Sequence, residues 1–156
     1  MSGGTEKGES TFRFLLPNAV IPLAVGLLLY VLFCPETYVT RFVSRFLPGV
    51  NAGNAVVPLP ESAAFTALRN YGFDFLWAYA LVSALCLITG TEKRQIALAA
   101  AVTALFGIYS EAAQFFGWVP GTGDAADAII EISAALIGAF TIYFFSRRKE
   151  KDNEKQ

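Results

Sequence analysis

The chemistry open to this chain depends on a few acidic residues that stand within apolar runs. Asp74, Glu111 and Glu131 are each the one charged residue of a long apolar stretch. Gln114 follows Glu111 by one helical turn, and Asp127 precedes Glu131 by one turn. Carboxylates at such spacings can bind cations, transfer protons as general acids or bases, or hold a divalent metal ion.

The residue types that the chain lacks exclude several kinds of active site. The 156 residues include no His, which excludes His-based metal sites and Ser-His-Asp triads. Ser110 and Ser133 therefore have no His to activate them as nucleophiles. The formal net charge of −1 gives no reason to expect nucleic-acid binding. The acidic residues remain as the candidates for function.

The acidic residues fall in runs that are long enough to cross a membrane. Hydrophobic residues make up 54% of the chain and charged residues only 16%, against about 25% charged in soluble domains. A bilayer core needs about 20 apolar residues in helical form. We therefore predict an all-α integral membrane protein with four transmembrane helices. The spans are expected at about 14–33, 71–90, 96–118 and 128–146, within a membrane domain covering 13–146.

The segments outside the spans carry their own patterns. Residues 1–12 are rich in Gly, Ser and Glu and are predicted to be disordered. In the outer loop, 34–70, apolar residues recur at helical spacing after Tyr38, which predicts a short interfacial helix. Ser62 is expected to cap a second short helix, Ala63 to Asn70.

The distribution of Lys and Arg predicts the orientation of the chain. With four spans, the N-terminus, the loop with Lys93 and Arg94, and the charged tail 147–156 share one side and hold most of the basic residues. The positive-inside rule assigns that side to the cytoplasm. Both termini are therefore expected in the cytoplasm, and the loops 34–70 and 119–127 are expected to face outward.

This topology brings acidic residues from three spans and one loop to the same level of the membrane. Asp74 enters from the outer side, and Glu111 lies near the outer end of its span. Asp124 and Asp127 precede or open the fourth span, and Glu131 follows one turn later. An ionisable residue within a span is costly and usually faces a cavity or the bundle interior.

Acids placed side by side cannot all ionise without a positive partner. That partner is Arg69, a divalent metal ion, a bound cationic group, or protons. The candidate ligands of a divalent cation are Glu111, Asp127 and Glu131. The whole predicted binding cluster comprises Arg69, Asp74, Glu111, Gln114, Asp124, Asp127 and Glu131.

Structural roles are the alternative for each of these residues. Asp124 and Asp127 fit a helix N-cap and a first-turn acid, which the helix dipole favours. For Asp74, the structural alternative is an ion pair with a neighbouring Arg. Glu111 lies toward the C-terminal end of its helix, where the dipole disfavours an acid, so its structural alternative is a hydrogen bond or an ion pair. Capping explains Glu131 less well than the two Asp residues, because Glu131 lies beyond the first turn.

A series of polar and small residues in the second half of the chain follows a recognisable order. The series is Glu111-Ala-Ala-Gln114, Pro120-Gly121, Asp127, Ala134 and Gly138, preceded by Arg69-Asn70-Tyr71, Asp74 and Leu76-Trp77-Ala78-Tyr79. It resembles the VanZ-like family of small bacterial membrane proteins. The resemblance covers Arg69 to Gly138.

That resemblance implies a place in the bacterial cytoplasmic membrane, with a role at its outer face near cell-envelope precursors. The name-giving member is associated with antibiotic resistance, at a low level, to the glycopeptide teicoplanin. This chain departs from the family pattern at three positions. Thr122 replaces an Arg, Glu131 replaces an Asn, and Phe75 replaces a His that many members carry. The first two changes make the cluster more acidic and favour a bound cation, or Arg69 in place of the missing Arg.

Two functions remain open from the sequence. In the first, the acidic cluster binds a cation, a lipid headgroup or a cationic ligand and influences the cell envelope without turnover. In the second, the chain is a membrane enzyme that acts on a lipid-linked envelope substrate with its carboxylates and a divalent metal. The absence of an activated nucleophile favours binding over catalysis. The expected partners are the lipid bilayer, a lipid headgroup or envelope precursor, and a second copy or another membrane protein.

Overall fold

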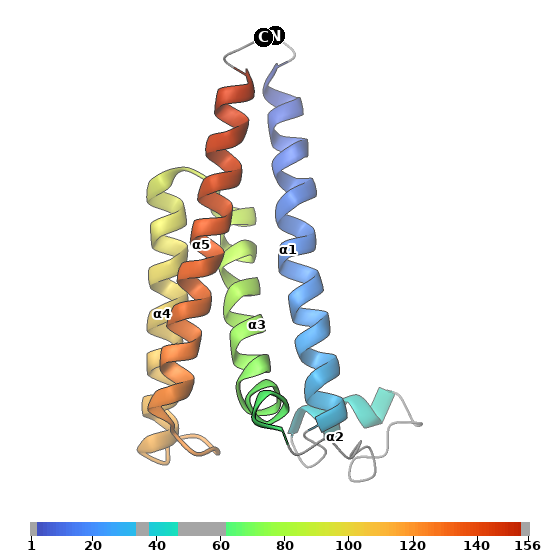
Figure 1. Cartoon of the computed structure of the whole chain (residues 1–156), viewed down its shortest axis with the longest axis vertical. Coiled ribbons are helices and arrows are strands. Elements are labelled where there is room, and N and C mark those ends of the chain that lie inside the picture. Colours follow the sequence, from blue (N-terminus) through green and yellow to red (C-terminus); the bar gives the residue numbers. More distant parts are fainter. Residues whose placement is uncertain (1–2, 34–37, 47–61, 154–156) are drawn as a thin grey trace.

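The computed structural model describes residues 3–33, 38–46 and 62–153, and these residues are almost entirely helical. The helices are α1 (Gly3–Phe33), α2 (Tyr38–Phe46), α3 (Ala63–Thr89), α4 (Lys93–Phe115) and α5 (Ala125–Asn153) (Figure 1). Four of them, α1, α3, α4 and α5, are long and apolar enough to cross a membrane. The described ranges contain no strand. The all-α class is therefore confirmed, and each of the four predicted spans falls on a helix that is long and apolar enough to cross a membrane.

Helix α3 is the centre of the bundle. It packs against α1, α4 and α5, and α4 also packs along α5. Figure 1 shows the first turns of α1 and the last turns of α5 at one end, and α2 at the other. A tight turn at Gly90, whose φ of 103° suits glycine, joins α3 to α4. The loop between α4 and α5 consequently lies at the same end as α2 and the start of α3.

The interior of the bundle combines small side chains with a few large apolar ones such as Leu15 and Ile142, and many other large apolar side chains face outward. Ala78, Ala134 and Ala135 are fully buried, whereas Phe140 is 65% exposed. A methyl group added at Gly138 of α5 would lie 3.4 Å from the carbonyl oxygen of Tyr79 in α3. Small residues let membrane helices approach closely, while lipid covers the large ones. Ala134 and Gly138, the small residues of the VanZ-like series, are both buried, and Gly138 lies where α5 approaches α3 closely.

The structure differs from the prediction at the start of α1. This helix is already formed at Gly3, whereas a disordered segment was expected over residues 1–12. The Arg13 guanidinium donates to the Glu9 carboxylate at 2.6 Å, one turn away on the same face. Such i,i+4 pairs support a helix that already continues into an apolar run.

Helix α3 also differs from the prediction, because it is one continuous element. Ser62 is its N-cap, with the Ser62 hydroxyl accepting from the Phe65 amide at 3.4 Å, as expected. The prediction of a separate short helix ending at Asn70 is wrong, because α3 continues without a break to Thr89. No proline lies between Ser62 and Thr89 to stop it. The part of α3 that is apolar enough to span a membrane begins at Asn70, next to the predicted start at 71.

The ends of α4 and α5 are set by two local motifs. Helix α4 stops at Phe115 rather than at Trp118, because Gly117 takes a φ of 70°. The Gly117 amide then donates to the Gln114 carbonyl at 3.0 Å, and the Trp118 amide donates to the Ala113 carbonyl at 2.8 Å. This pair of bonds is a Schellman motif. Helix α5 starts three residues before the predicted position of 128 and extends through the charged tail to Asn153.

Candidate functional site

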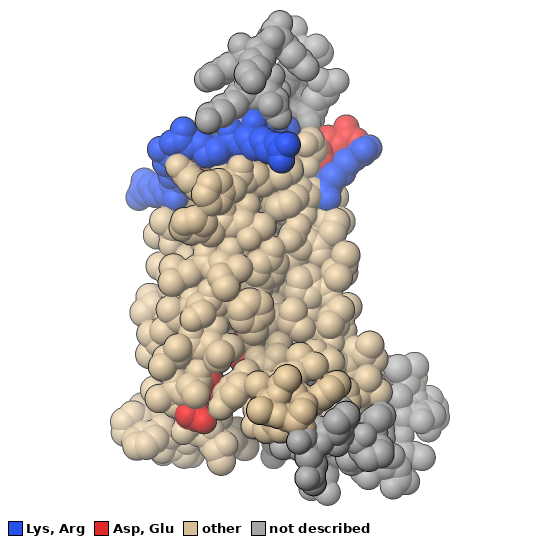
Figure 2. Space-filling view, viewed as in Figure 1, with Lys and Arg blue, Asp and Glu red and all other residues tan. Residues whose placement is uncertain are grey.

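A cavity of about 660 Å³ opens at one end of the bundle. Its walls come from α3, α4, α5 and the loop between α4 and α5, with Phe33 at the end of α1. Figure 2 shows Lys and Arg gathered at the opposite end, and acidic atoms in a hollow near the α4–α5 loop. The acidic residues that line the cavity are Asp74, Glu111, Asp124, Asp127 and Glu131.

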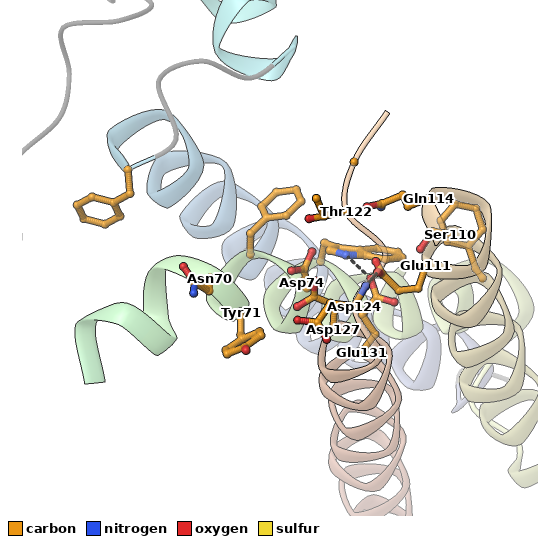
Figure 3. Close-up of a pocket in the computed structure, with 15 residues that line it drawn as sticks. Asn70, Tyr71, Asp74, Ser110, Glu111, Gln114, Thr122, Asp124, Asp127 and Glu131 are labelled. Carbon is orange, nitrogen blue, oxygen red and sulfur yellow. Dashed lines mark hydrogen bonds between the residues drawn. The ribbon is translucent and has the colours of Figure 1, made fainter. Parts of the chain in front are cut away.

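The predicted cluster converges on this cavity. In Figure 3, Asp74 from α3 lies beside Asp124, Asp127 and Glu131 at the start of α5, and Glu111 lies across from them on α4. Gln114 and Thr122 also line the cavity. The described residues of its wall include no Lys or Arg. The side chain of Arg69 lies outside the described part of the structure, so its predicted pairing with Asp74 stays a prediction.

Glu131 is the most deeply placed acid of the cavity. Its side chain is only 2% exposed. Its Oε1 accepts a hydrogen bond from the Trp77 indole Nε1 at 3.1 Å. Its Oε2 is buried and has no hydrogen-bond partner among the described residues. A buried carboxylate oxygen without a donor is costly, so Oε2 is an atom that a ligand donor would satisfy.

Gly107 of α4 makes room for the Glu131 side chain. A Cβ atom at Gly107 would overlap the Glu131 carboxylate. Gly107 is buried, so the α4 backbone lies directly against the carboxylate. The depth of Glu131 therefore depends on the missing side chain at residue 107.

Asp127 provides a second unpartnered oxygen. Its Oδ1 is buried and has no hydrogen-bond partner in the described part of the chain. Asp127 lies one helical turn before Glu131, so the two side chains share one face of α5. Asp74 lines the same cavity from α3. The side chains of Asp74, Asp127 and Glu131 thus line one cavity, and two of their oxygens are buried without a partner among the described residues.

Glu111 and Asp124 have structural roles. The Glu111 Oε2 accepts a hydrogen bond from the Asp124 backbone amide at 2.8 Å. The Asp124 Oδ1 in turn accepts from the Ala126 amide at 2.9 Å and caps α5. At Gly123, an added Cβ would lie 2.6 Å from the Glu111 carbonyl oxygen. The structural alternatives are confirmed for both residues. Asp124 is an N-cap, and Glu111 makes a structural hydrogen bond whose donor is a backbone amide.

Trp77 and Gly107 are site residues that the sequence did not single out as such. The sequence singled out Trp77 only as part of the segment Leu76-Trp77-Ala78-Tyr79, yet its indole N–H donates to Glu131. It also packs edge-on against Phe106, with ring centroids 5.5 Å apart. The available signal was the spacing of Trp77 from Asp74, which places both on one helical face.

The predicted metal ligands do not gather around a common point. Among the described residues, no three Asp, Glu, His or Cys side chains form a group that could hold a metal ion. One oxygen of Glu111 is bound to the Asp124 amide, and one oxygen of Glu131 is bound to Trp77. These bonds orient the two carboxylates toward different partners.

Comparison of the chain with protein-family models, curated proteins and solved structures gave no match. The functional argument therefore depends on the cavity and on the pattern of residues along the chain. Both place the acidic residues that could bind a ligand at the same end of the bundle.

Proposed function

We propose that this chain is a multi-pass protein of the bacterial cytoplasmic membrane whose acidic cavity binds a cationic group at the outer leaflet. The observation that carries this proposal is the pair of buried, unpartnered oxygens on Glu131 and Asp127. Glu131 and Asp127 line a cavity together with three further acidic residues, and the described residues of its wall include no Lys or Arg. A cation that enters would supply the missing donors and offset the clustered negative charge.

The proposed orientation rests on the ends of the bundle. Lys93 and Arg94 begin α4, and Arg147 and Arg148 lie near the end of α5, opposite the cavity. The positive-inside rule assigns the basic end to the cytoplasm and the cavity to the outer face. Helix α2 fits the proposed interfacial position, because it exposes two Arg side chains one turn apart and, next to them, two Phe side chains one turn apart.

The VanZ-like resemblance supports a role in the cell envelope. It implies a link to susceptibility to glycopeptides such as teicoplanin. Thr122 stands where the family has an Arg, and Glu131 adds an acid where the family has an Asn. Both residues line the cavity. The departures thus fit a variant that holds a cation where typical members use their own Arg.

The hydrogen bond that Glu111 already accepts favours binding over catalysis. An enzyme would need Glu111 as a base or metal ligand, and its Oε2 is already bonded to the Asp124 amide. The Ser110 hydroxyl donates to the Gly107 carbonyl at 2.9 Å, and it has no His to activate it. No described group of the cavity is arranged as an activated nucleophile.

Native mass spectrometry after purification in mild detergent tests the proposed function. Wild type and the Glu9→Gln variant should retain a non-covalently bound cation or amine-containing species, which Glu131→Gln should lose. Glu9 is an exposed acid at the opposite end, so its variant controls for the loss of one negative charge. Gln has the shape of Glu and still offers an acceptor to Trp77, which favours a folded variant.

Identical bound species in all three proteins would overturn the proposed function, provided that thermal unfolding shows all three to be folded. A retained divalent metal, together with turnover of a lipid-linked precursor, would establish the enzyme alternative instead. A changed teicoplanin susceptibility in cells expressing wild type, absent with Glu131→Gln, would connect the cavity to the envelope.

A further inference from the structure

We infer that the cationic group is a primary ammonium, held by the carboxylates of Glu131, Asp127 and Asp74 that line the cavity. This inference rests on the proposed function and names its ligand class. The ammonium belongs either to an ethanolamine-type lipid headgroup or to a free amine of the same chemistry. Three features of the cavity support it: its size, the type of acceptors it offers, and its poor fit to a metal ion.

The size of the cavity fits an organic group. At about 660 Å³, it lies within the range of about 300–1,000 Å³ that is typical of small-molecule pockets. One water occupies about 30 Å³ in the liquid, and a bare ion needs no more. The cavity is therefore far larger than a desolvated metal ion requires.

The acceptors of the cavity match the donors of a primary ammonium. Such a group carries three N–H donors and no acceptor. Glu131 Oε2 and Asp127 Oδ1 each lack a donor and lie on one face of α5, one turn apart. The Asp74 carboxylate borders the same space from α3. A quaternary ammonium has no N–H, so it could donate no hydrogen bond to these carboxylates.

A divalent metal ion fits these residues less well. Hard cations such as Ca²⁺ take six to eight oxygen ligands, and Mg²⁺ demands near-octahedral geometry. The described residues do not assemble three acidic ligands around one point. Trp77 and the Asp124 amide already occupy one oxygen each of Glu131 and Glu111. Separate single oxygens suit the directional donors of an ammonium group better.

The walls of the cavity suit the remainder of an amine-bearing molecule. Phe33, Phe73 and Phe106 line it beside the acids. Phe106 is also half-exposed on the outside of α4, so apolar surface continues from the cavity wall to the lipid-facing side. An aminophospholipid and a small free amine both present the same ammonium group to the carboxylates.

Trp77 provides a direct reporter for the test. The chain has two Trp residues, and Trp118 is exposed in the α4–α5 loop. The Trp118→Phe variant therefore leaves Trp77, in contact with Glu131, as the only indole. In detergent, ethanolamine should change its fluorescence saturably, and choline, which is ethanolamine with three N-methyl groups, should not. Glu131→Gln and Asp127→Asn should each weaken ethanolamine binding about tenfold or more, while Glu9→Gln should not.

Reconstitution into lipid nanodiscs separates the two sources of the ammonium group. One set contains phosphatidylethanolamine and the other phosphatidylcholine, with the same fraction of phosphatidylglycerol in both. A Glu131-dependent difference in Trp77 emission between the sets supports a lipid headgroup. No difference, together with ethanolamine binding in the phosphatidylcholine discs, supports a free amine.

The failures of the two proposals are distinguishable. A Glu131-dependent response to choline or to Mg²⁺, equal to or stronger than the response to ethanolamine, would overturn the primary ammonium and leave the cation-binding function standing. No response to ethanolamine, choline or Mg²⁺, with no Glu131-dependent bound mass, would overturn both.

Discussion

Glu131 is held in place by two neighbours that act in different ways. Trp77 donates a hydrogen bond to one carboxylate oxygen and so fixes the side-chain direction. Gly107 contributes only space, since any side chain there would overlap the carboxylate. The other oxygen is buried against Gly107 and has no hydrogen-bond partner among the described residues. The position of this free oxygen thus depends on one aromatic donor and on one absent side chain.

The Gly107→Ala variant should displace Glu131 while keeping every charge. The added methyl group overlaps the carboxylate, so overpacking should lower the unfolding free energy by about 1–3 kcal/mol. Ethanolamine binding, followed by Trp77 fluorescence, should weaken about tenfold. Gly26→Ala is the matched control, because its methyl group would meet Leu76 of α3 at an ordinary 3.4 Å. Equal behaviour of the two variants would contradict the role of Gly107.

The Trp77→Phe variant should leave both oxygens of Glu131 without a donor. Loss of the indole N–H from a buried carboxylate should cost about 1–3 kcal/mol of unfolding free energy, measured by denaturant titration in detergent. Trp118→Phe makes the same change of side chain at an exposed position and should have much less effect. The assigned hydrogen bond would be refuted by the same loss of stability in both variants.

At the scale of elements, the loop between α4 and α5 is tied down at both ends. The Schellman motif at Gly117 closes α4, and Asp124 caps α5. Glu111 joins the two ends through the Asp124 amide. Because α5 begins at this anchored loop, its first turn and the carboxylates of Asp127 and Glu131 are positioned against α4.

Two substitutions at Asp124 separate its capping role from its charge. Asp124→Ala should lower the unfolding free energy by about 0.5–2 kcal/mol, because the Ala126 amide loses its acceptor. Asp124→Asn keeps an oxygen acceptor and should stay close to wild type in stability and in ethanolamine binding. Asp124 is exposed, so its charge contributes little. A large loss of binding with Asn alone would make Asp124 a ligand rather than a cap.

The sequence predicted the elements and the meeting of the acids better than it predicted the contacts within the site. Long uncharged runs define spans, and the alternation of spans brings Asp74, Glu111 and Glu131 to one end regardless of detail. Which side chain Glu131 meets depends on the rotation of α3 and α4 about their axes. Helical periodicity gives the face of a residue but not its neighbour, so Trp77 and Gly107 were missed as partners.

At the scale of the whole molecule, the bundle has two chemically different ends. Most of the described Lys and Arg lie at one end, and the acidic cavity opens at the other, where α2 carries the exposed Arg41 and Arg45. Between them, many large apolar side chains cover the outside. This arrangement suits a bilayer of fixed orientation and predicts which loops meet which compartment.

Labelling of single cysteines in whole cells tests that orientation. Cys34 and Cys86 are first replaced by Ser or Ala, and a new cysteine is placed at the exposed Thr122 or Thr89. A membrane-impermeant maleimide should label Thr122→Cys in intact cells. Thr89→Cys should be labelled only after lysis, because it lies at the basic end of the bundle. The reverse result would invert the topology and place the cavity in the cytoplasm.

The charges along α5 have a consequence for an energised membrane. Asp127 and Glu131 lie near its first turn, and Arg147 and Arg148 lie near its last turns. In the proposed orientation, a potential that is negative inside attracts the arginines inward and repels the carboxylates outward. An elementary charge that crosses the full field changes in energy by about 2.3 kcal/mol per 100 mV. The transmembrane voltage therefore acts in the same sense at both ends of α5 and stabilises its alignment across the membrane.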